Sequence, residues 1–146
     1  AFYVPEFQMM YAAEESARFL HHACRGLPLR EKPERAPLPA DRFYVRSLEH
    51  ALGYFGSRVL YPARPAVEEE ELRLLPLATP PTRGKEFEAS AELLGYMLGN
   101  ALYEAYLRGR VRPGTLRRVL LADLTAPGRA KELYRQLAQK LGRSSR

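Results

Sequence analysis

The sequence of 146 residues lacks several features that mark common classes of protein. Its single cysteine, Cys24, cannot form a disulfide within the chain, so nothing points to an oxidising compartment and we expect a cytoplasmic protein. No apolar run approaches the roughly 18 residues that a membrane span needs. Residues 1–11 contain Pro5 and Glu6 but no basic segment followed by an apolar block. We therefore expect neither a membrane location nor a signal peptide.

Motifs of the common catalytic and cofactor-binding classes are also missing. The chain has no HExxH or CxxC pair for zinc and no GxSxG turn for a nucleophilic serine. Residues 82–85 lack the preceding glycine and the following Ser or Thr of a phosphate-binding loop. No glutamate is followed three residues later by a histidine, as a ferritin-like diiron bundle requires. These absences favour a non-enzymatic protein over an enzyme, and they predict no cofactor.

One group of metal-capable side chains stands out near the beginning of the chain. His21 lies seven residues after Glu14 and three before Cys24, with His22 beside it, so these side chains would lie near one face of a helix. A metal or cofactor site at His21, His22 and Cys24 is therefore one alternative function. The simpler interpretation makes Cys24 a small core residue and places the two histidines at the border of the surface.

The composition is that of a folded domain, with 46% hydrophobic and 27% charged residues. On folding, a chain of this length buries about 70% of the surface that its unfolded state exposes, which is enough to form one hydrophobic core. Nine of the twelve prolines fall between residues 28 and 81, where they interrupt helical patterns. The sequence thus predicts one all-α (mostly α) domain over residues 1–146: a compact bundle of four to six helices with a proline-rich middle segment wrapped around it.

Apolar residues at steps of three and four predict the individual helices. Residues 6–25 form the first, with an inward stripe of Met10, Ala13, Ala17, Leu20 and Cys24. Ser47 is expected to cap a helix over residues 48–60, whose inward side carries Leu48, Leu52, Phe55 and Val59. A short helix is expected over residues 66–75.

The longest periodic segment is residues 85–108, with Gly109 as its cap and an inward stripe of Phe87, Ala91, Leu94, Leu98, Ala101 and Ala105. We expect it to form the centre of the bundle together with residues 6–25. Two further helices are expected, over residues 113–121 and from about residue 127 to Gly142. The inward side of the last is predicted to carry Ala130, Leu133, Leu137 and Leu141, with Tyr134 beside them.

Small residues repeat every four positions along the longest predicted helix, at Ala91, Gly95 and Gly99. Glycine costs about 1 kcal/mol relative to alanine inside a helix, so two at this spacing predict a close contact with another backbone. That contact is either internal, against Ala13 and Ala17, or a seam with a second copy or a partner helix. The predicted main function is therefore a non-enzymatic protein-protein interaction or regulatory module that binds a protein partner or forms a homodimer through this interaction ridge.

The net charge of +6 is concentrated at the C-terminal end. From Arg110 onward, ten basic residues stand against Asp123 and Glu132. Such a field attracts phosphates, so nucleic-acid binding by the last two helices is an alternative function. The expected basic face consists of Arg117, Arg118, Arg129, Lys131, Arg135 and Lys140.

Two further questions about this basic region stay open. The last two helices could form a helix-turn-helix or an ordinary helical hairpin. Their charge could also have a simpler origin: an arginine-rich composition, the preference of helix C-termini for cations, or neutralisation by the glutamates of residues 68–71.

The stretch from Leu94 to Leu121 resembles a helix and its sequel in the N-lobe of HECT-type ubiquitin ligases. The catalytic cysteine of that family lies in a separate C-terminal lobe, and no cysteine follows Cys24 in this chain. The resemblance therefore implies no site and no activity here.

Overall fold

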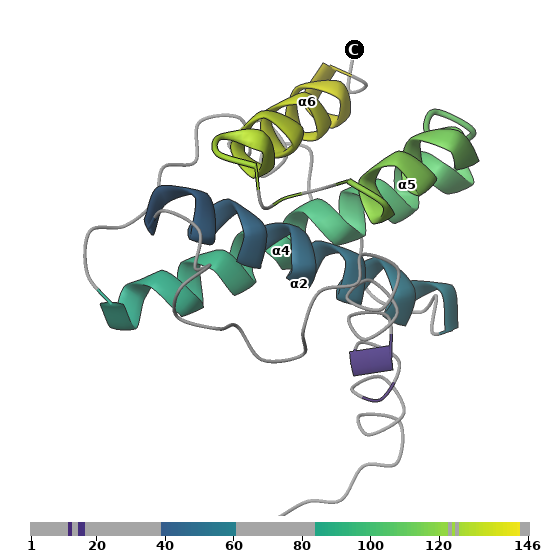
Figure 1. Ribbon diagram of the computed structural model, residues 1–146. Coiled ribbons are helices and arrows are strands. Elements are labelled where there is room, and N and C mark those ends of the chain that lie inside the picture. The colour runs from purple at the N-terminus through teal and green to yellow at the C-terminus, as the bar shows by residue number, and fades with distance from the viewer. Residues whose placement is uncertain are drawn as a thin grey trace, which may run out of the picture.

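The computed structural model describes residues 39–60, 84–122, 124 and 126–143, together with Ala12, Glu15 and Ser16. Four helices make up these ranges, labelled as in Figure 1: α2 (Pro39–Leu60), α4 (Gly84–Leu107), α5 (Pro113–Leu120) and α6 (Arg129–Arg143). The described part of the chain contains no strand, so the protein is mostly helical, as predicted. None of its helices combines the length and the apolar character needed to cross a membrane. The predicted helices over residues 6–25 and 66–75, and most of the proline-rich middle, lie outside the described residues.

The two longest helices, α2 and α4, form the central pair and run side by side in the same direction (Figure 1). Near their starts, the rings of Phe43 and Phe87 pack edge to face with centroids 5.5 Å apart. Near their ends, Arg58 of α2 bonds to Glu104 of α4. Two parallel helices need a connection that runs from the end of the first back to the start of the second, a distance of about 30 Å. Residues 61–83 join α2 to α4, and a chain of this length can span that distance.

The predicted pairing of residues 6–25 with residues 85–108 concerns a first segment that lies mostly outside the described residues. Among the described residues, α4 packs mainly against α2, with a smaller contact to α6. The apolar stripe on α4 was predicted correctly: Leu98 and Ala101 are buried, and Phe87 packs partly buried against the same core. The periodicity showed which face of α4 is buried, but it carried no information on which segment covers that face.

The start of α2 was predicted wrongly. The helix begins at Pro39 rather than near residue 48, because proline fits the first helical turn, where its missing N–H needs no partner. Ser47, the predicted cap, lies inside α2 and is fully buried, and its hydroxyl donates to the carbonyl oxygen of Phe43 at 2.9 Å. Val59, which was expected to face inward, is 54% exposed.

The helices in the second half follow the sequence pattern closely. α4 ends just before Gly109, whose φ of 68° lies in the left-handed region that favours glycine, as expected for its cap. α5 runs from Pro113 to Leu120. α6 begins slightly later than predicted and continues through Gly142, and it buries the expected stripe of Ala130, Leu133, Tyr134, Leu137 and Leu141.

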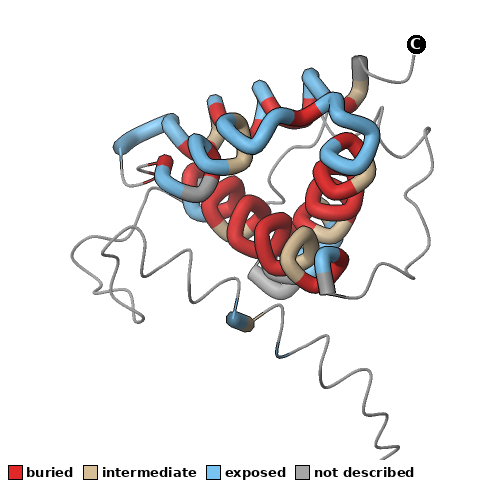
Figure 2. The backbone as a smooth tube through the Cα atoms, turned by 90° about the vertical axis from the view of Figure 1, so that its right-hand side faces the viewer, coloured by how far each residue is buried: buried red, intermediate tan, exposed pale blue. Residues whose placement is uncertain are grey.

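Buried residues from all four helices belong to one hydrophobic cluster. Burial is nearly continuous along the middle of α2 and α4, whereas α5 and α6 are exposed along one side (Figure 2). α6 packs on α2 and α4, and its Tyr134 ring lies 5.2 Å from that of Tyr44, centroid to centroid. Burial raises the pKa of the Tyr134 hydroxyl far above its ordinary value, and the neighbouring Tyr44 acts in the same direction. Burial also raises the pKa of Tyr44, and the charge of Arg135 partly opposes that effect.

The start of α6 is attached to the start of α2 through a carboxylate. Asp41 is buried, and it accepts a hydrogen bond from the backbone N–H of Gly128 at 3.1 Å, directly before α6. The first N–H groups of a helix have no partner within the helix, and the helix dipole favours a negative charge beside them. Asp41 therefore caps α6 from a distant part of the sequence.

Replacing Asp41 with alanine is expected to lower the free energy of unfolding by about 1 kcal/mol, the usual cost of losing a helix cap. Urea titration followed by circular dichroism measures this loss. Asp41→Asn, which keeps an acceptor oxygen, should lose less than the alanine variant. An alanine variant as stable as the parent would show that Asp41 does not hold α6 in solution.

Candidate functional site

The small-residue ridge of α4 lies buried against α2. A Cβ atom on Gly95 would overlap the Cβ of His50 and come within 2.9 Å of the carbonyl oxygen of Ser47. A Cβ atom on Gly99 would overlap the carbonyl oxygen of Ala51. The two glycines thus allow the backbones of α2 and α4 to approach closely, which is the kind of contact that their spacing predicts.

Of the two alternatives for this ridge, packing within the chain accounts for its position. Ala91 has no exposed surface, and Gly95 and Gly99 are buried with it. The partner residues suggested by the sequence, Ala13 and Ala17, lie outside the described residues. In this arrangement the ridge is covered by α2 and presents no open surface to a second chain.

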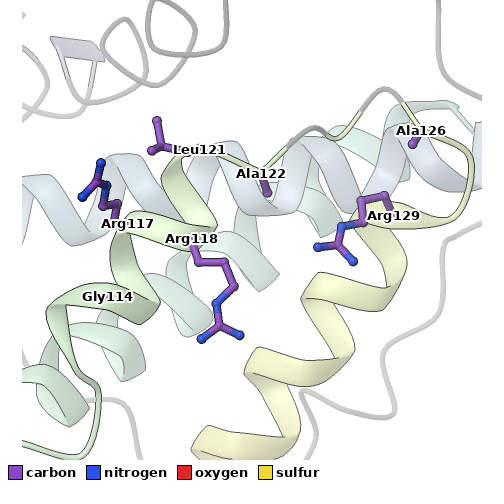
Figure 3. A pocket seen from close by; sticks show the side chains of 7 residues that line it. All are labelled: Gly114, Arg117, Arg118, Leu121, Ala122, Ala126 and Arg129. Atoms are coloured by element: carbon purple, nitrogen blue, oxygen red, sulfur yellow. The ribbon is translucent and has the colours of Figure 1, made fainter.

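Three residues of the predicted basic face gather around one hollow in the surface. Arg117 and Arg118 belong to the second half of α5, and Arg129 is the first residue of α6. The hollow has a volume of about 580 Å³ and lies between these two helices and their connection. Arg118 and Arg129 extend from the two helices toward the space between them (Figure 3). We call this site the arginine hollow; its remaining lining residues are Gly114, Leu121, Ala122 and Ala126.

The other three residues of the predicted basic face lie further along α6. Lys140 comes eleven residues after Arg129, about three helical turns, and so lies on the same side of the helix. Lys131 and Arg135 are one turn apart and lie on a different side of α6. Arg135 is near enough to Tyr44 for its positive charge to oppose the rise that burial causes in the pKa of the Tyr44 hydroxyl. The six residues therefore do not form a single face, and only Lys140 continues the side that carries the hollow.

The charged side chains among the described lining residues of the hollow are all positive. Arg117, Arg118 and Arg129 make no side-chain hydrogen bond or salt bridge with any other described residue, and none of the described lining residues is acidic. At the start of α6, the Asp41 carboxylate accepts the Gly128 N–H, and the Glu132 carboxylate accepts a hydrogen bond from Gln136 at 2.8 Å. Three cations without an acidic partner in the described structure form a site that favours an anion.

The described lining residues of the hollow offer no group suited to covalent or acid-base catalysis. Its polar side chains are arginines, which stay charged at all ordinary pH values and cannot act as bases. The remaining lining residues are glycine, alanine and leucine. The described residues of the hollow can therefore bind and orient an anionic group.

No metal site is found among the described residues, where no three His, Cys, Asp or Glu side chains lie close enough to hold an ion. The candidate ligands His21, His22 and Cys24 all lie outside those residues. The glutamates of residues 68–71, which could neutralise the basic surface, lie outside them as well.

A buried polar network was not anticipated from the sequence. The guanidinium of Arg58 donates to Asn100 Oδ1 at 3.1 Å and to Glu104 Oε1 at 2.6 Å, and it lies 4.7 Å from the ring centroid of Tyr103. Arg58 is only 2% exposed. An arginine in the last turn of a helix is typical of a solvated surface, and the only signal in the sequence was a polar pair, Asn100 and Glu104, four residues apart on α4.

The chain matches no protein-family model, no curated protein and no solved structure. Its helical fold alone is compatible with many functions. The function is therefore argued from the arginine hollow and the surface around it.

Proposed function

We propose that this protein is a non-enzymatic helical module that binds nucleic acid through α5 and α6. The observation that supports this proposal is the arginine hollow, where Arg117, Arg118 and Arg129 surround one space and have no acidic partner among the described residues. Phosphate groups are the most common anionic ligands of such arginine clusters, because the guanidinium fork matches two phosphate oxygens.

The charge around the hollow favours a polymer of phosphates over a single small anion. From Arg110 to the end of the chain, the sequence carries ten basic and two acidic residues. Lys140 lies on the Arg129 side of α6 and about 16 Å further along the helix, which is more than the spacing of neighbouring phosphates. A nucleic-acid backbone can contact both positions at once, whereas a single anion cannot.

The other two functions considered from the sequence have less support. A self-associating interaction module relies on the ridge of Ala91, Gly95 and Gly99, and this ridge packs against α2. A metal or cofactor protein relies on residues that the structure does not describe. Nucleic-acid binding is the only one of the three whose candidate residues are both described and open to solvent.

The proposal predicts binding that weakens steeply with salt, because each neutralised phosphate releases counterions. Reversing two charges in the hollow, Arg118→Glu with Arg129→Glu, should weaken binding on the order of a hundredfold and reduce the slope of log Kd against log salt by about two. Fluorescence anisotropy with labelled oligonucleotides at several salt concentrations measures both quantities.

The matched control reverses two charges on the other side of α6, with Lys131→Glu and Arg135→Glu. This variant has the same net charge as the first and should keep most of the affinity. Equal losses in the two variants would show that binding follows net charge alone and not the hollow. An unmodified protein that binds no nucleic acid at low salt would contradict the proposed function itself.

A further inference from the structure

We propose that the arginine hollow takes one unpaired nucleotide, so that the protein prefers single-stranded nucleic acid to duplex. This inference rests on the proposed function and specifies its ligand. Its basis is the chemistry of the lining, the placement of the arginines on two helices and the open arrangement of α5 and α6.

The lining combines cations with apolar surface. Four of its seven residues are Gly114, Leu121, Ala122 and Ala126, and none of these offers a side chain that a bare phosphate could use. Leu121 is 48% exposed, and covering apolar surface is favourable by about 25 cal/mol per Å². A ligand that carries both a phosphate and a flat, largely apolar group would satisfy both parts of the lining. A nucleotide is such a ligand.

The arginines lie on both sides of the hollow. Arg118 extends from α5 and Arg129 from α6, toward the space between the helices (Figure 3). A guanidinium can bond to phosphate oxygens with its edge and stack on a base with its face. Because none of the described lining residues is aromatic, the guanidinium groups and Leu121 are the described surfaces against which a base would lie. The hollow is open to solvent rather than enclosed, so a base would lie against its surface.

The arrangement of α5 and α6 is less suited to a duplex. In a helix-turn-helix, two helices pack closely so that the second enters the major groove. Here α6 packs mainly on α2 and α4, and the hollow opens between α5 and α6 (Figure 3). A duplex presents phosphates on its outside but keeps its bases stacked, so a base could enter the hollow only after unpairing, at a cost of a few kcal/mol. A single strand avoids that cost, since its bases are already unpaired.

The test compares three probes with the full chain at one salt concentration: a labelled oligo-deoxythymidine of about 16 nucleotides, a duplex of the same length, and unlabelled inorganic polyphosphate as a competitor. Anisotropy is expected to give at least a tenfold tighter Kd for the single strand than for the duplex. Polyphosphate matched for charge should compete at least tenfold less well than unlabelled oligo-deoxythymidine.

The informative variant is Leu121→Ser, which removes apolar surface from the hollow without changing its charge. We expect it to raise the Kd for oligo-deoxythymidine about fivefold, which corresponds to the smallest usual loss of affinity when one base-stacking contact is removed. The Kd for the duplex should not change. Leu93→Ser is the matched control, because Leu93 is 59% exposed on α4 and does not line the hollow. This control should bind like the parent protein.

The outcomes separate the inference from the proposed function. Equal or tighter binding of the duplex, full competition by polyphosphate, or unchanged binding by Leu121→Ser would overturn the inference and leave nucleic-acid binding in place. Failure to bind either oligonucleotide would overturn both. Tighter binding to a phosphopeptide or to vesicles of anionic lipid than to the single strand would also overturn both, because the hollow would then serve another class of partner.

Discussion

Replacing Gly99 with alanine is expected to lower the free energy of unfolding by about 3 kcal/mol, the upper part of the usual range for overpacking. A Cβ atom there would overlap the carbonyl oxygen of Ala51 and lie 2.9 Å from the Cβ of Tyr54. A backbone oxygen cannot rotate away, so α2 and α4 would have to separate. Gly95→Ala should behave in the same way, because its Cβ would meet His50 and the backbone of Ser47. Urea denaturation of the single variants measures the loss.

Gly114→Ala is the matched control for these two substitutions. Gly114 lies in the first turn of α5, and an added Cβ would meet no atom within 4 Å. Alanine favours a helix over glycine by about 1 kcal/mol, so this variant should be as stable as the parent or slightly more stable. A Gly99→Ala variant that is also as stable as the parent would show that the helices are not in close contact in solution.

The same variants separate the two interpretations of the ridge. If the ridge packs within the chain, Gly99→Ala loses stability and its mass by light scattering does not change. If the ridge were a seam between copies, the variant would lose its dimer and keep its helicity. Only the first outcome agrees with a ridge that is buried against α2 of the same chain.

The second half of the fold was predictable because its signals are local and agree with one another. The apolar stripe of α4 recurs at helical spacing, and Gly109 ends that helix in the left-handed conformation that favours glycine. Pro113 opens α5 for an equally local reason. In α2 the local signals conflicted: Pro39 could start a helix or belong to the proline-rich segment, and Ser47 could cap a helix or bond within one.

The candidate site was predictable only in part, for a physical reason. Sequence identified the basic residues of α5 and α6, but a surface depends on the angle of each residue around its helix and on how two helices are placed. Arg118 and Arg129 meet because the connection between α5 and α6 leaves a hollow there, and no periodicity encodes that distance. Lys131 and Arg135 lie apart from Arg118 and Arg129, because the helical turn of α6 places them on a different side of the helix from Arg129.

Removing the carboxylate of Glu104 is expected to be the other large perturbation, with a loss of about 3 kcal/mol for Glu104→Ala. The guanidinium of Arg58, whose side chain is only 3% exposed, would stay buried and keep its hydrogen bond to Asn100, but it would lose its ion pair with Glu104. An exposed side-chain hydrogen bond, by contrast, contributes about 1 kcal/mol. Urea denaturation of Glu104→Ala and of an exposed variant, Glu92→Ala, separates these cases; the Glu92 side chain bonds to Tyr54 at an exposed position.

A double variant tests whether the stability lost in Glu104→Ala comes from burying the Arg58 guanidinium without the Glu104 carboxylate. Arg58→Met with Glu104→Ala removes both charges, so it should be more stable than Glu104→Ala alone, because the buried guanidinium that has lost its ion pair with Glu104 is removed as well. A simple loss of favourable contacts would instead make the double variant less stable than either single variant. The comparison thus tests whether Arg58 is as deeply enclosed between α2 and α4 in solution as its 2% exposure requires. If it is, the pair constrains the register of the two helices, because a shift of one turn would separate Arg58 from both Asn100 and Glu104.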